Sequence, residues 1–169
     1  MISKYSKPRV FLHWLSAIVI IWATLSGFWV GLANPSQAIK NWVGFFNVSL
    51  TTLFIPFFVI RLFYAFLSAK PKDELLTKKE EKLAAIGHVA LYAAITVVMV
   101  TGVLMMERPI NVFNWFSIPQ PLTIPQLTSL FNKIHVISCA VLGILVAGHI
   151  LAVVKHHWQG KALLRRMSW

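Results

Sequence analysis

Residues 133–155 read KIHVISCAVLGILVAGHILAVVK, and this stretch decides the fold. No charged residue lies between its two terminal lysines. The apolar run therefore exceeds the roughly 20 residues that cross a hydrocarbon core of about 30 Å. Two histidines, His135 and His149, stand inside it, fourteen residues apart. Because this spacing is nearly four helical turns, both imidazoles should lie on one face of a single membrane-spanning helix.

The remainder of the chain is also unusually apolar. Of its 169 residues, 57% are hydrophobic and 12% are charged, whereas a soluble domain carries about 25% charged residues. Three further apolar runs are long enough to cross a membrane. We therefore predict an all-α fold, an integral membrane four-helix bundle that forms a single domain over residues 1–169. The predicted spans are at about 10–32, 41–67, 83–106 and 133–154.

The uncharged segment 109–132 is not counted among the spans. It contains four prolines and many Asn, Gln, Ser and Thr residues. A helix so rich in proline could not satisfy its own backbone hydrogen bonds in lipid. We expect an ordered loop at the membrane surface, with Trp115 and Phe116 at the interface.

The formal charge of +11 comes from basic residues at the edges of the apolar runs. This placement favours membrane lipid over nucleic acid as a partner. Lys and Arg are concentrated in the N-terminal segment, in the loop between the second and third spans, and in the C-terminal tail. Since basic loops stay on the inner side of the membrane, we predict that both termini are cytoplasmic. The proline-rich loop would face the periplasm, and the protein would be a multi-pass protein of a bacterial inner (plasma) membrane.

Four of the six histidines lie within the predicted spans, where an imidazole is costly and usually faces the bundle interior. Counted from the flanking charges, His13, His88 and His149 lie in the cytoplasmic half, and His135 lies near the periplasmic edge. Any one of them could be a structural, hydrogen-bonded residue. Together they are typical of axial ligands for haems stacked across the bilayer. Zinc is the competing interpretation, but the spans lack carboxylates, and the single cysteine, Cys139, is expected to be a buried apolar residue away from the histidines.

Several short motifs occur in a recognisable order along the four spans. They are Tyr5-Ser6, His13-Trp14-Leu15, Val59-Ile60-Arg61-Leu62, Gly87-His88-Val89 with Leu91-Tyr92, Gly102-Val103-Leu104-Met105-Met106, Lys155-His156-His157 and Leu163-Leu164-Arg165-Arg166-Met167. Together with His135 and His149, their order and spacing resemble the bacterial cytochrome b561 family over nearly the whole chain. The resemblance implies two b-type haems, each held by two histidines, and electron transfer between a periplasmic donor and a membrane quinone such as ubiquinone.

The resemblance also implies roles for individual residues. By position, His13 and His149 are the axial ligands of the cytoplasmic-side haem, and Arg61 lies where it could pair with a haem propionate. The alternative for Arg61 is an interfacial anchor. His156 corresponds to the family's histidine near a quinone site, with an ordinary surface residue as the alternative. His88 is expected as a supporting or quinone-site group and as a reserve ligand.

The second haem is where the chain departs from the family. His135 matches one family ligand, but the partner position in the second span holds Asn47, and an amide is a poor haem ligand. The periplasmic haem is therefore either absent or five-coordinate through His135. Met105 and Met106 lie at a similar depth and are interpreted as packing residues.

Superoxide is the leading candidate for the donor, because the family includes superoxide-oxidising members. Two rival functions stay open. One is a haem-containing membrane subunit that serves a partner redox protein docked on the proline-rich loop, which co-purification would favour. The other is a haem-based gas sensor with an open position on the His135 haem, which carbon monoxide binding would favour. The sequence does not fix the haem number, the donor, or whether the chain forms a homodimer.

Overall fold

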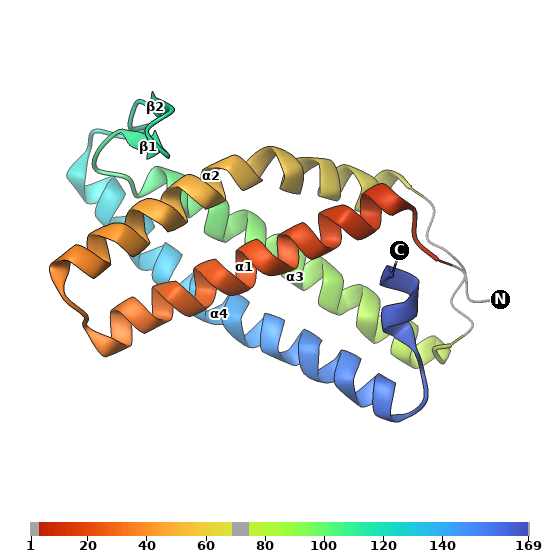
Figure 1. The fold of residues 1–169 in the computed structure, drawn as a ribbon. Helices are drawn as coiled ribbons and strands as arrows, with labels where there is room; N and C mark the ends of the chain where they lie inside the picture. Colours follow the sequence, from red (N-terminus) through yellow and green to blue (C-terminus); the bar gives the residue numbers. More distant parts are fainter. Residues whose placement is uncertain (1–3, 69–74, 169) are drawn as a thin grey trace.

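The computed structural model describes residues 4–68 and 75–168, and four long helices run side by side through it (Figure 1). The helices are α1 (Lys7–Ala33), α2 (Gln37–Leu67), α3 (Lys78–Leu104) and α4 (Pro125–Trp158). A hairpin of two short antiparallel strands, β1 (Ile110–Val112) and β2 (Phe116–Ile118), follows α3, and a 3-10 helix, η1 (Leu163–Met167), follows α4. All four long helices have the length and apolar composition needed to cross a membrane. The predicted all-α four-helix membrane fold is confirmed.

The helices run alternately up and down, so each end of the bundle has its own set of chain segments. The start of α1, the end of α2, the start of α3 and the end of α4 lie together, and we call this the terminal end (Figure 1). The β hairpin lies at the opposite end, which we call the hairpin end (Figure 1). This order places both ends of the described chain on one side of the bundle.

One cluster of buried apolar side chains joins all four helices. It consists of Val19 from α1, Phe54 and Phe58 from α2, Ile95 from α3, and Leu142 from α4. Contacts are most extensive between α1 and α2 and between α3 and α4, so the bundle is built from two helical hairpins that meet around this cluster. Many large apolar side chains remain exposed on the outside of the bundle. Exposure of this kind is suited to lipid, which is as apolar as the side chains themselves.

All four helices begin earlier than the predicted spans, and the difference is largest for α3 and α4. We expected a loop throughout residues 109–132, but α4 starts at Pro125. Proline at the first position of a helix loses no hydrogen bond, because the N–H groups of the first turn have no partner within the helix. The α3 helix starts at Lys78, because Thr77 and Glu80 form a capping box. The loop prediction for 109–132 is therefore wrong for its last part.

The β hairpin is fastened to α2 by a buried serine. Ser49 Oγ donates a hydrogen bond to the Asn111 carbonyl and accepts one from the Phe113 N–H, both at 3.1 Å. Ile110 and Val112 are buried next to Met106 in a second apolar cluster. Met106 therefore has the packing role that the sequence predicts.

Replacing Ser49 with Ala should lower the free energy of unfolding by about 1–3 kcal/mol, because the Phe113 N–H would lose its acceptor in a buried place. Denaturation of the detergent-purified protein measures this loss. Ser117→Ala, on the exposed strand β2, is the matched control and should change little. Equal losses in the two variants would contradict the fastening role of Ser49.

Candidate functional site

Four ionisable side chains, one from each helix, come together in the terminal half of the bundle. They are His13 from α1, Arg61 from α2, His88 from α3 and His149 from α4. Arg61 Nη2 lies 3.0 Å from His13 Nδ1, and the ring centroids of His88 and His149 are 5.3 Å apart. The His13 ring is also within electrostatic reach of His88 and His149. The structure therefore groups the residues that the resemblance assigned to one end of the protein.

Hydrogen bonds indicate which ring nitrogen of these histidines is available to a metal. A guanidinium can only donate, so His13 Nδ1 accepts from Arg61, and a neutral His13 ring carries its proton on Nε2. A carbonyl can only accept, so His88 donates Nδ1–H to the Ala84 carbonyl at 2.7 Å, and the lone pair of the neutral ring is on Nε2. In residues 4–68 and 75–168, no hydrogen bond reaches the ring nitrogens of His149.

Arg61 is directed into the bundle. Besides its contact with His13 Nδ1, Arg61 Nη1 lies 3.5 Å from the His13 carbonyl. The guanidinium carbon lies 5.5 Å from the ring centroid of Tyr92 on α3, a cation–π distance. These contacts to two other helices favour a charge partner inside the site over an interfacial anchor.

His135 lies toward the hairpin end and is fixed against α3. Its Nδ1 is 3.1 Å from the Val98 carbonyl and 3.2 Å from Thr101 Oγ1, whose own hydroxyl donates to Val97. Both oxygens accept, so the proton sits on Nδ1 and the lone pair on Nε2. A Cβ added at Gly102 would lie 3.1 Å from His135 Cε1, so the ring lies directly against this glycine. Both His135 and His149 thus contact α3, as their spacing predicts.

Cys139 does not lie apart from the histidines, contrary to the expectation from sequence. Its Sγ is 3.5 Å from His135 Nε2. The physical reason is helical geometry, because residues four apart on a helix are neighbours on one face. The thiol therefore occupies the side of the His135 ring on which a metal would bind.

Asn47, at the position where the resemblance predicts a histidine, is hydrogen-bonded to α1. Its Oδ1 accepts a hydrogen bond from Trp22 Nε1 at 3.0 Å, and its Nδ2 donates to Ser26 Oγ at 2.8 Å. Ser26 in turn donates to the Trp22 carbonyl at 2.7 Å. The bonds of Asn47 therefore go to α1, whereas those of His135 go to α3.

The donor set fits a haem better than a bare metal ion. Among the described residues, no group of three or more His, Cys, Asp or Glu is arranged to hold a metal ion. A haem brings its own four nitrogen ligands and needs only axial ligands from the protein. Imidazoles on facing helices suit that requirement, whereas a zinc site needs three or four protein ligands.

Two residues next to His156, Glu80 and Lys161, were not predicted from the sequence. His156, at the end of α4, lies beside Glu80 of α3, with 3.8 Å between Nδ1 and Oε1. The pattern Thr77-x-x-Glu80 is that of a capping box and could have identified Glu80 as the start of a helix. Besides His156, Glu80 also contacts Lys161. No local pattern could have identified this pair, because the two residues are 81 positions apart in the chain.

A four-helix membrane bundle with imidazoles on facing helices has the arrangement that a membrane-embedded b-type cytochrome needs. The family model described as prokaryotic cytochrome b561 matches residues 4–169. Cytochrome b561 homolog 2 of Escherichia coli (strain K12) is 26% identical over 170 residues, which cover 97% of this chain and 90% of that protein. The chain therefore belongs to the prokaryotic cytochrome b561 family and is a multi-pass membrane protein. The resemblance inferred from the motifs is confirmed, and with it b-type haem binding in general.

Replacing Gly102 with Ala tests the contact between α3 and the His135 ring. An alanine inside a helix is ordinarily more stable than a glycine by up to about 1 kcal/mol. At Gly102 the new Cβ would push against the ring, so this gain should be lost, whereas Gly44→Ala, with nothing within 4 Å, should keep it. Thermal unfolding in detergent measures the difference. An equal gain in both variants would contradict the close approach of His135.

Proposed function

We propose that this b-type cytochrome carries electrons between a donor at the hairpin end and a quinone at the terminal end. The observation that carries the proposal is the meeting of His13, Arg61, His88 and His149 from four different helices. Haem, when bound, supplies the one-electron redox chemistry. The residues of the chain supply its axial ligands, its burial and its charge partners.

The proposed axial ligands are His13 and His149. Iron binds the lone pair of an imidazole nitrogen, whereas the bond from Arg61 leaves the His13 proton on Nε2. In the haem-bound protein, Arg61 would pair with a haem carboxylate, a stronger partner for a guanidinium than an imidazole, and His13 would carry its proton on Nδ1. His88, beside His149 and already protonated on Nδ1, is the reserve ligand.

We propose that each chain holds a single haem, at the terminal end of the bundle. His135 is the one imidazole near the hairpin end, and the hydrogen bonds of Asn47 to Trp22 and Ser26 support a structural role for this residue. Met106 is packed beneath the hairpin, which supports its role as an apolar residue. A second haem would therefore be five-coordinate through His135. An open position on such a haem would favour the gas-binding alternative.

The proposed orientation puts the terminal end in the cytoplasm and the hairpin end in the periplasm of a bacterial inner membrane. The concentration of Lys and Arg at the terminal end supports it. His156, whose side chain is 16% exposed at that end, is the proposed contact of a ubiquinone headgroup. Superoxide is the leading candidate for the donor. The exposed Trp115 and Phe116 on the β hairpin would suit a docked redox protein instead.

Replacing either His13 or His149 with Ala should abolish the low-spin absorption spectrum of the haem, because the iron would lose an axial ligand. Reduced-minus-oxidised spectra of the detergent-purified variants measure this change. His157→Ala, an exposed histidine at the end of α4, should leave the spectrum unchanged. Low-spin spectra that survive both replacements would refute this ligand pair.

A further inference from the structure

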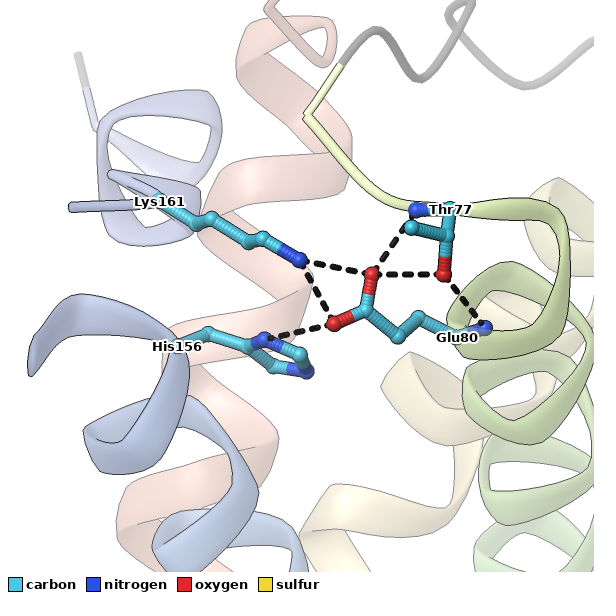
Figure 2. Close-up of polar contacts among 4 residues, drawn as sticks. All are labelled: Thr77, Glu80, His156 and Lys161. Carbon is cyan, nitrogen blue, oxygen red and sulfur yellow. Dashed lines mark hydrogen bonds and ion pairs between the residues drawn. The ribbon is translucent and has the colours of Figure 1, made fainter. Parts of the chain in front are cut away.

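A cluster of polar side chains joins the ends of α3 and α4 at the terminal end of the bundle (Figure 2). We call it the Glu80 cluster, and its members are Thr77, Glu80, His156 and Lys161. Lys161 Nζ lies 2.5 Å from Glu80 Oε1 and 2.6 Å from Oε2. The Thr77 N–H and hydroxyl both donate to Oε2 at 2.8 Å. His156 Nδ1 lies 3.8 Å from Oε1 of the same carboxylate.

Glu80 carries its negative charge at every physiological pH. It stands in the first turn of α3, before the apolar part of the helix, where the helix dipole favours an anion. The hydrogen bond from Lys161 and those from Thr77 lower the pKa of Glu80 from 4.5 to about 2. The stabilisation that these bonds give is present above pH 4.5 and is lost only as the pH falls through about 2.

The nitrogen of His156 that faces this carboxylate has no hydrogen-bond partner. Nδ1 is buried, and 3.8 Å is too long for a hydrogen bond. A buried polar nitrogen without a partner costs free energy, and Glu80 Oε1 is the acceptor in front of it. A shift of the ring by about 1 Å would complete the bond. The second ring nitrogen, Nε2, has no dashed contact to the other three side chains drawn in Figure 2.

The turn that follows α4 fixes the position of Lys161. Gly160, with φ +78°, reverses the chain direction, and the Lys161 N–H bonds back to the His156 carbonyl at 2.9 Å. The same segment then reaches α1, because Met167 accepts a hydrogen bond from Trp14 Nε1 at 2.9 Å. Trp14 adjoins His13. Lys161 is therefore part of a segment fastened to α1, α3 and α4, and it is not a freely moving surface cation.

We propose that Glu80 is a positioning residue for His156 in the quinone site, and that Lys161 holds Glu80 in place for this role. The proposal rests on the proposed function, in which His156 contacts the quinone headgroup. With Nδ1–H held by Glu80, Nε2 is the nitrogen that meets the headgroup. As N–H it donates a hydrogen bond to a quinone carbonyl, and as a lone pair it accepts one from a quinol hydroxyl.

The capping box offers a simpler role for Glu80, so the experiment has to separate the two. Glu80→Gln removes the carboxylate that faces His156, and Glu81→Gln is the matched control, since Glu81 stands exposed in the same first turn. Two quantities are compared in the full-length protein in detergent. One is the ¹⁵N resonance of His156, identified by its loss in His156→Gln. The other is the pair of constants KM and kcat for the reduction of ubiquinone-1 by superoxide, the proposed donor.

In the wild type and in Glu81→Gln, we expect the Nδ1 resonance of a protonated nitrogen. In Glu80→Gln, the proton should redistribute to Nε2, and KM should rise roughly tenfold, with kcat and the haem spectrum little changed. Lys161→Met keeps the capping box but releases the carboxylate, so it should shift KM in the same direction. If Glu80→Gln does not fold, Lys161→Met tests the proposal in its place.

Two results would overturn the proposal in different ways. If Glu80→Gln lowers the unfolding temperature but leaves the His156 resonances and KM like those of Glu81→Gln, Glu80 is a helix cap and nothing more. If His156→Gln reduces ubiquinone-1 like the wild type, the quinone assignment in the proposed function is wrong. A shift of the His156 resonances in Glu80→Gln would then still show that the carboxylate positions the ring.

Discussion

Polar side chains inside a hydrocarbon layer have to find their partners within the protein, and this constraint determines which helix faces turn toward one another. Arg61 of α2 bonds to His13 of α1, His135 of α4 bonds to the backbone of α3, and Asn47 of α2 bonds to α1. Each contact links two helices. The apolar cluster around Phe54 and Phe58 fills the space between them, but apolar packing alone would not fix the rotation of a helix surrounded by lipid.

The two ends of the bundle satisfy this constraint with different side chains. At the terminal end, Arg61 bonds to the ring of His13, and the rings of His88 and His149 lie next to each other. At the hairpin end, the ring of Phe46 contacts Trp22, Trp42 and Phe113. Next to this aromatic group, the side chain of Asn47 makes all its bonds to α1. The position where the resemblance predicts a second haem ligand is thus part of a packed, hydrogen-bonded interior, and our proposal of one haem per chain rests on this arrangement.

Much of this arrangement could be predicted from the sequence, because its signals are long or periodic. Uncharged runs identified the four helices, and the flanking charges separated His135 from the other histidines. The start of α4 was missed because Pro125 was interpreted as a breaker, although proline suits the first turn. The position of Cys139 followed from its spacing of four from His135, which the prediction did not use. The pairing of Glu80 with Lys161 depends on the turn at Gly160 and on the packing of α3 against α4, so no local pattern could reveal it.

The haem content per chain tests the central claim most directly. Pyridine haemochrome absorbance against protein mass in the detergent-purified wild type should give about one haem per chain, because Asn47 leaves His135 without an axial partner. Asn47→His introduces the histidine that the resemblance predicts at that position and should raise the ratio toward about two. A ratio of about two in the wild type would contradict the account, since it would require a second haem held at His135 in spite of Asn47.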